Sequence, residues 1–231
     1  MGGWAALIAA ILFRRWLGAE LGLLRNMGLV HYGAVPETGD AAGWFALIQA
    51  NRLVGFTLLN GFDLVNYALV GLILLGLYAA LRRYSSLIIL AVTMGLIGVS
   101  TYFASNQALP LLALSGQFAT ATTDSQRSML LAAGRTLLTT NDFFSGSGVT
   151  AAILLVTLAE LIAAWVMLKT EPFDKATAII GIIANTLGLG VVITLAFAPP
   201  LTFIPLSASA PFLLIWYILV GLRLIRLARL D

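Results

Sequence analysis

The sequence predicts an all-α fold: a polytopic transmembrane helical bundle of five to six spans, with an outer cap of short amphipathic helices. Of the 231 residues, 60% are hydrophobic and only 10% are charged, whereas soluble domains average about 45–50% apolar and about 25% charged residues. Five apolar stretches also approach the ~20 residues that a helix needs to cross a bilayer. Together these observations exclude a soluble enzyme, a disordered chain and a nucleic-acid-binding protein.

The five clear spans are bounded by charged residues, prolines or helix-capping residues. Ser147 is placed to cap the third span and Asp174 the fourth, because short polar side chains accept hydrogen bonds from the first free N–H groups of a helix. Pro211 suits the first turn of the fifth span, where its missing N–H costs nothing. In chain order we expect the spans at about Asn60–Leu81, Leu87–Ala104, Val149–Leu168, Ala176–Ala198 and Pro211–Leu227.

Residues 1–56 form either a first span or interfacial amphipathic helices, and the sequence leaves both alternatives open. Trp4–Phe13 is apolar but short, and Arg14 and Arg15 interrupt it. Residues 31–41, which include the single histidine His31, are predicted to be a loop. Residues 42–56 resemble a helix that rests on the membrane or enters it. The membrane bundle proper is expected at 57–231.

The connection at about 107–147 is too apolar to be an ordinary loop. Leucines recur on both sides of a polar stretch, and Thr123–Gln126 fits a capping box in which Gln126 reaches back to the N-cap. We therefore expect two short amphipathic helices at the interface, covering one end of the bundle.

Lysine and arginine positions predict the topology. If the five spans alternate in direction, seven basic residues share one side and three share the other, which carries the cap. Because the basic side of a membrane protein faces the cytoplasm, we expect a cytoplasmic C-terminus and a cap on the outer side. Five arginines on this side are expected to bind anionic lipid headgroups; they are Arg82, Arg83, Arg223, Arg226 and Arg229.

Several short sequence motifs resemble a known family. They are YFASN from Tyr102, LSGQFATATT from Leu114, LAAG from Leu131, VMLK from Val166, GIIAN from Gly181, and WYILV from Trp216 followed by Arg223-Leu224 and Arg226-Leu227. From about Asn51 to Arg229 the chain resembles small prokaryotic multi-pass membrane proteins of the domain-of-unknown-function family numbered 4386, or a near relative. The resemblance implies a six-helix protein of the cytoplasmic (inner) membrane of a prokaryote, and no known activity. The chain departs from that pattern at Arg14 and Arg15, which break the usual first span.

Glu160 is the first candidate site residue, since an ionisable side chain inside a membrane is costly and often functional. It lies midway along its span, and Thr157, Ala163 and Ala164 on its helix face are small enough to admit a neighbouring helix. Asn185 lies at a similar depth in the next span, so we expect a Glu160–Asn185 hydrogen bond. Burial would favour the neutral carboxyl. Glu160 then either links helices structurally or binds a proton or cation.

Asp63 is the second candidate. Asn60, Asp63, Asn66 and Tyr67 share one helix face in the outer part of their span. This polar stripe either docks against the 107–147 cap through Ser and Gln side chains or lines a vestibule for a small polar ligand. Further along the chain, the aromatic pair Trp216–Tyr217 is expected to pack inside the bundle.

Other chemistry has little support in the sequence. The chain has no cysteine and one histidine, so we expect no metal site, and no motif implies a cofactor or a catalytic residue. Three functions remain. We rank first a structural or accessory bundle that assembles with itself or with a membrane partner, with lipids around it and no nucleic acid. A small transporter or channel-like protein using Glu160 and Asp63 comes second, and an intramembrane enzyme third.

Overall fold

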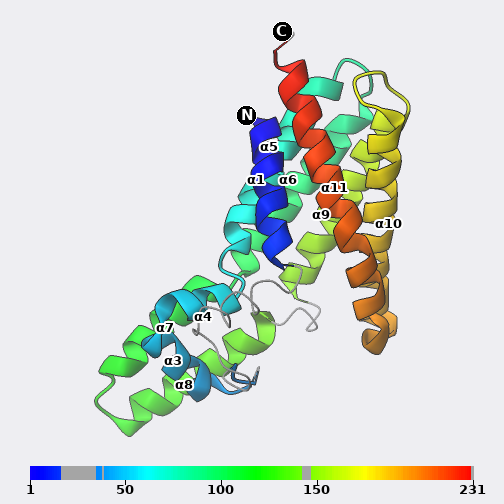
Figure 1. Ribbon diagram of the computed structural model, residues 1–231. Coiled ribbons are helices and arrows are strands. Elements are labelled where there is room, and N and C mark those ends of the chain that lie inside the picture. Colours follow the sequence, from blue (N-terminus) through cyan, green and yellow to red (C-terminus); the bar gives the residue numbers. More distant parts are fainter. Residues whose placement is uncertain (17–34, 38, 142–146, 230–231) are drawn as a thin grey trace.

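The computed structural model describes residues 1–16, 35–37, 39–141 and 147–229, and its regular elements there are all helices. The predicted all-α fold class is therefore confirmed. Figure 1 shows a bundle of long helices and a smaller group of helices that projects from one end of it. The elements are α1 (Gly2–Trp16), α3 (Ala41–Ala50), α4 (Arg52–Leu58), α5 (Asp63–Leu81), α6 (Leu87–Ser105), α7 (Ala108–Thr120), α8 (Asp124–Asn141), α9 (Gly148–Leu168), α10 (Lys175–Phe197), the 3-10 turn η2 (Pro199–Leu201) and α11 (Phe203–Leu227).

Five helices of the described chain are long and apolar enough to cross a membrane, which indicates a membrane-embedded protein. They are α5, α6, α9, α10 and α11, and they match the five expected spans closely. Helices that follow one another pack side by side, and α6 lies especially close to α9. A Cβ added at Gly98 of α6 would come within 2.9 Å of Val156 and 3.1 Å of the Ala152 carbonyl, so this contact requires a residue without a side chain.

The helix ends confirm one of the two N-caps expected for the spans. The Ser147 hydroxyl accepts a hydrogen bond from the Val149 N–H at 3.3 Å, as expected. Asp174 occupies the N-cap position of α10, but its side chain makes no capping hydrogen bond.

The expectation for Pro211 is wrong. Helix α11 begins at Phe203, so Pro211 lies inside the helix, on an exposed position, and not in its first turn. A proline inside a membrane helix is tolerated where neighbouring groups form hydrogen bonds with the backbone carbonyl that it leaves unpaired. Helical backbone is also strongly favoured in lipid, because its N–H and C=O groups pair within the segment. The fifth span therefore continues past the proline to the turn at Pro199–Leu201.

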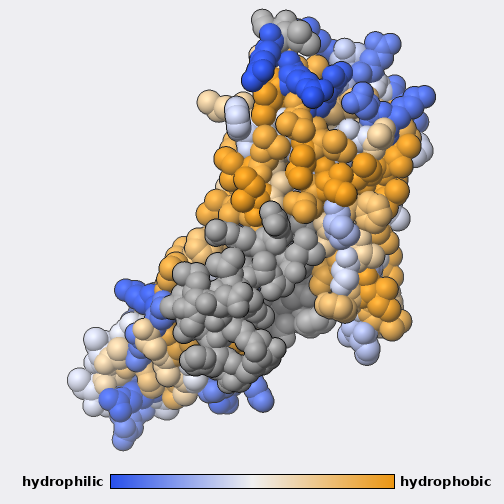
Figure 2. Space-filling view, in the orientation of Figure 1, coloured by the Kyte–Doolittle hydropathy of each residue, from blue (hydrophilic) through white to orange (hydrophobic). Residues whose placement is uncertain are grey.

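Basic residues gather at one end of the bundle, which we call the charged end. Figure 2 shows hydrophilic side chains at this end and a broad hydrophobic surface below it. The helix order accounts for the clustering, since α5, α9 and α11 end there while α6 and α10 begin there. Seven basic residues of the described chain belong to it, namely Arg82, Arg83, Lys169, Lys175, Arg223, Arg226 and Arg229.

Helix α1 packs in the bundle between α5 and α11. Its inner face consists mainly of small residues, with Ala5, Ala6, Ala9 and Ala10 all buried, whereas Trp4, Ile8 and Ile11 are exposed. This distribution is typical of helix contacts in membranes, where small residues allow close approach. At 15 residues α1 is ~22 Å long, short of the ~30 Å hydrocarbon core. Residues 17–34 lie outside the described residues, so whether residues 4–30 cross the membrane stays open. His31 belongs to the same stretch.

The group of α3, α4, α7 and α8, which we call the arm, contains the two helices expected in the cap. Its capping box is present: the Thr123 hydroxyl accepts from the Gln126 N–H at 3.2 Å, although the Gln126 side chain accepts from Thr122. The helix expected at 42–56 is instead broken at Asn51, whose backbone is extended and whose side chain caps α4. The arm has its own apolar core, formed by Ala41, Trp44, Phe45, Ile48, Leu59, Ala108, Leu111 and Leu138.

Candidate functional site

Glu160 lies in the interior of the bundle and has a defined partner. Its side chain is only 3% exposed, and the Tyr217 hydroxyl on α11 donates a hydrogen bond to Glu160 Oε1 at 2.8 Å. The two helices come together at this depth because Ala159, Ala163 and other small residues of α9 are completely buried. The bond therefore joins α9 to α11 inside the core.

The expected hydrogen bond between Glu160 and Asn185 is not formed, so that prediction is wrong. Asn185 is buried as expected, but its Nδ2 donates to the Gly181 carbonyl one turn earlier in its own helix, at 2.9 Å. The physical reason is that α11 supplies the partner: its phenol reaches the carboxyl directly. Trp216, the residue before Tyr217, lies against Gly181. Both aromatic residues pack inside the bundle, as predicted.

Asp63 belongs to a second polar cluster, at the end of the bundle from which the arm projects, which we call the arm end. The Tyr102 hydroxyl on α6 donates to Asp63 Oδ2 at 3.3 Å. The Asn106 side chain donates to the Tyr102 hydroxyl at 3.3 Å and to the Asn60 carbonyl at 3.2 Å. Asn60 has a positive φ of 59°, a left-handed conformation that asparagine tolerates better than most residues. The turn before α5 is thus tied to the end of α6.

Asn106 also connects this cluster to the arm. Its Oδ1 accepts a hydrogen bond from the N–H of Ala108, the first residue of α7, at 3.1 Å. Docking of the stripe against the cap through Ser and Gln side chains stays a prediction. Asn106 adds a connection that the sequence analysis did not expect. Asn66, another member of the stripe, has a buried Oδ1 with no hydrogen-bond partner among the described residues.

Tyr67 joins the arm-end cluster through its ring. It stacks on Tyr102 with centroids 3.7 Å apart and planes 6° from parallel, and it packs against both the arm-end cluster and the main core. The structure therefore links Asp63 and Tyr67 through Tyr102. Glu160 pairs separately with Tyr217, and Asn185 has its partner in its own helix.

Sequence reasoning missed the partners of both carboxyl groups. Tyr217 was expected only to pack, and Tyr102 appeared only among the family motifs, although each hydroxyl contacts a carboxylate oxygen. A signal was available, since a buried tyrosine hydroxyl usually finds a polar partner. The sequence did not show which carboxyl each tyrosine would meet, because that depends on how the helices are rotated about their axes.

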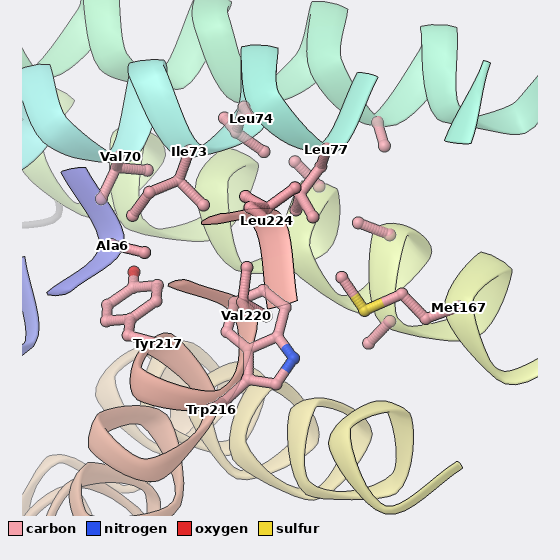
Figure 3. Packing of buried hydrophobic residues seen from close by; sticks show 14 of the residues in the cluster. Ala6, Val70, Ile73, Leu74, Leu77, Met167, Trp216, Tyr217, Val220 and Leu224 are labelled. Atoms are coloured by element: carbon pink, nitrogen blue, oxygen red, sulfur yellow. The ribbon is translucent and has the colours of Figure 1, made fainter. Parts of the chain in front are cut away.

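The half of the bundle between Glu160 and the charged end is filled mostly by aliphatic side chains, beside the Tyr78 ring and the buried Thr177. Figure 3 shows Leu74 and Leu77 of α5 beside Val220 and Leu224 of α11. We call this region the apolar layer. Its fully buried members are Leu74, Leu77, Leu81, Ile88, Met167 and Val220.

The charged end carries contacts typical of a membrane boundary. Lys169 Nζ lies 4.6 Å from the centre of the exposed Trp165 ring, and the Arg82 guanidinium lies 5.8 Å from that of Tyr78. Arg223 Nε donates to the Pro172 carbonyl, which fixes the loop between α9 and α10. Aromatic rings with basic side chains above them are enriched at membrane interfaces.

Neither a metal site nor a known relative adds to this description. No group of three His, Asp or Glu side chains within the described ranges could hold a metal ion. An open groove of about 530 Å³ on the outer face of α6 is lined by Thr93, Leu96, Ile97, Ser100, Thr101 and Ala104, none of them a candidate site residue.

Comparison of the chain with protein-family models, curated proteins and solved structures gives no match. The resemblance to family 4386 stays a prediction.

Proposed function

We propose that this protein is a structural or accessory membrane bundle that assembles with itself or with a membrane partner. In this proposal Glu160 is a neutral residue that links helices through its hydrogen bond to Tyr217. The observation that carries the proposal is the burial of this pair. Both side chains are at most 3% exposed, and the 2.8 Å hydrogen bond gives the Tyr217 hydroxyl an acceptor and Glu160 Oε1 a donor inside the core. A buried polar pair of this kind specifies how helices pack when its hydrogen bonds are made.

The transporter or channel-like alternative would need a polar path through the whole bundle. The arm half offers Asp63, Tyr67 and Tyr102 for such a path. On the other side of Glu160, the fully buried side chains of the apolar layer are aliphatic or thioether, and the side-chain hydroxyls near it are those of Tyr78 and Thr177, fewer than the arm half offers. Ions and polar solutes lose their hydration in such a region at high cost. This difference between the two halves favours the structural proposal.

The proposed location is the cytoplasmic membrane of a prokaryote, with the charged end and the C-terminus in the cytoplasm. Seven basic residues at one end of the described bundle support this orientation. We further propose that Arg82, Arg83, Arg223, Arg226 and Arg229 bind anionic lipid headgroups. Basic residues close to a membrane surface attract acidic lipids by about 1 kcal/mol each.

Substitution of Glu160 tests the structural proposal. Glu160→Ala should lower the free energy of unfolding by about 1–3 kcal/mol, because the buried Tyr217 hydroxyl loses its acceptor. Glu160→Gln keeps an oxygen acceptor and should cost less. Unfolding of the purified full chain in detergent micelles measures both, with Glu171→Gln on the exposed loop at the charged end as a matched control.

Two results would contradict the proposal. One is equal stability of the wild-type, Ala and Gln chains, which would mean that the hydrogen bond links nothing. The other is proton or cation flux in proteoliposomes that the wild type supports and Glu160→Gln abolishes at unchanged stability. That second result would favour the transporter alternative.

A further inference from the structure

We propose that the turn between α10 and α11 is a lipid-contact surface that rests at the boundary between the membrane hydrocarbon and the headgroups. We call residues 197–204 the tip; they run from the last residue of α10 through η2 to the first two residues of α11. Figure 1 shows the tip at the end of the bundle away from the charged end. This inference goes beyond the proposed structural role, and it holds for either orientation of the protein in the membrane.

The tip exposes large apolar side chains. The exposed fractions are 86% for Phe197, 74% for Phe203, 65% for Ile204 and 51% for Leu201. Turns that face water are instead rich in Gly, Asn, Asp and Ser. Exposed apolar patches mark sites where a protein contacts a membrane or another protein, so the tip needs an apolar partner.

The absence of charge around the tip favours lipid as that partner. No charged residue lies between Lys175 and Arg223, whereas the α5–α6 and α9–α10 turns at the charged end contain Arg82 and Lys169. A surface that binds another protein carries a polar rim around its apolar centre. The tip has a single polar side chain, Thr202, which is only 1% exposed.

The backbone of the tip also suits an apolar surrounding, in which each polar backbone group needs a partner within the protein. Pro199 and Pro200 have no N–H group to satisfy. The other N–H groups between the two α-helices donate to carbonyls of the same hairpin, at 2.7 Å from Ala198, 2.9 Å from Leu201 and 3.1 Å from Thr202. The connection between α10 and α11 therefore needs no water for its backbone donors.

The length of α10 places the tip at the far edge of the hydrocarbon. Helix α10 begins at Lys175 and has 23 residues, so it is ~34 Å long. The typical tilt of a membrane helix, about 20°, reduces its reach along the membrane normal to ~32 Å. The hydrocarbon core is ~30 Å thick. With Lys175 at the headgroups of the charged end, the tip reaches the opposite boundary, where its apolar side chains can point back into the acyl chains.

Spin labelling of the full chain in phosphatidylcholine vesicles tests the inference. The chain has no native cysteine, so Leu201→Cys carries a nitroxide at one position, and its exposed side chain makes the change mild. Molecular oxygen concentrates in the hydrocarbon, whereas a nickel chelate stays in water because it is polar. We expect strong relaxation of the nitroxide by oxygen and loss of the relaxation by nickel. Ser125→Cys, exposed on the arm, is the matched control and should show the reverse.

Two outcomes would overturn the inference. Relaxation by nickel as strong at Leu201→Cys as at Ser125→Cys would place the tip in water. Loss of relaxation by both oxygen and nickel would mean that protein covers the tip, either a second copy of the chain or another partner. Phe203→Cys repeats the measurement at a second exposed position, and it should show the same preference for oxygen if the whole tip contacts lipid.

Discussion

Trp216 is the largest fully buried side chain in the described part of the molecule, and its indole lies directly against Gly181 of α10. A Cβ at position 181 would come within 2.3 Å of Trp216 Nε1, a distance that atoms do not adopt. The indole has little freedom to move because the side chain is 0% exposed. At the scale of single residues, therefore, the absence of a side chain at 181 sets the distance between α10 and α11.

Gly181→Ala should lower the free energy of unfolding by about 1–3 kcal/mol, the usual cost of overpacking a filled core. Gly116→Ala is the matched control, since Gly116 also lies in a helix but has nothing within 4 Å of an added Cβ. There alanine should be neutral or stabilise by up to ~1 kcal/mol through helix propensity. Unfolding in detergent micelles measures both changes, and a Gly181→Ala chain as stable as the wild type would contradict the packing described.

At the scale of elements, α1 shows how small residues place a helix. Gly3 of α1 and Gly221 of α11 face each other, and a Cβ on either would come within 3 Å of the other's carbonyl oxygen. The same contact brings Leu7 within 3.0 Å of a Cβ at position 221. Such close approach gains packing contacts that larger side chains would prevent.

Substitution of Gly221 tests the position of α1. Gly221→Ala should lower the free energy of unfolding by about 1–3 kcal/mol, because the added Cβ would come within 2.9 Å of the Gly3 carbonyl oxygen on α1. Gly71→Ala on α5 is the matched control, since the nearest atom to a Cβ there, in Leu96, is 3.8 Å away. Unfolding of the purified chain in detergent micelles measures both changes. Equal stability of the two variants would mean that α1 does not pack against α11 at Gly221.

At the scale of the whole molecule, the charged end and the arm occupy opposite ends of the long helices (Figures 1 and 2). If the charged end is cytoplasmic, Ser125 of the arm should lie outside the cell and Ser86, between α5 and α6, inside it. Both positions are exposed. In intact bacterial cells a membrane-impermeant maleimide should therefore label Ser125→Cys and not Ser86→Cys. Labelling of Ser86→Cys alone would reverse the proposed orientation.

The sequence was sufficient for the fold class, for five spans and for the cluster of charges, because each follows from local composition. A run of ~20 apolar residues must become a helix in lipid, where each backbone polar group needs a partner within the segment. Glu160 and Asp63 were identified for the same reason, since a carboxyl group stands out in an apolar run. Among the predictions that depended on neighbours along the chain, the caps at Ser147 and Thr123 were confirmed. The capping bond at Asp174 is not formed, and Pro211 does not begin its helix.

Only the tertiary structure decided which side chains meet. Tyr217, not Asn185, became the partner of Glu160, because the rotation of each helix about its axis depends on packing against several others. The same holds for α3 and α4, which joined α7 and α8 in a separate core. In a chain so poor in charge, composition determined that the protein enters a membrane. The packing of the helices determined that Glu160 meets the Tyr217 hydroxyl in the core and that Asp63 meets Tyr102 at the arm end.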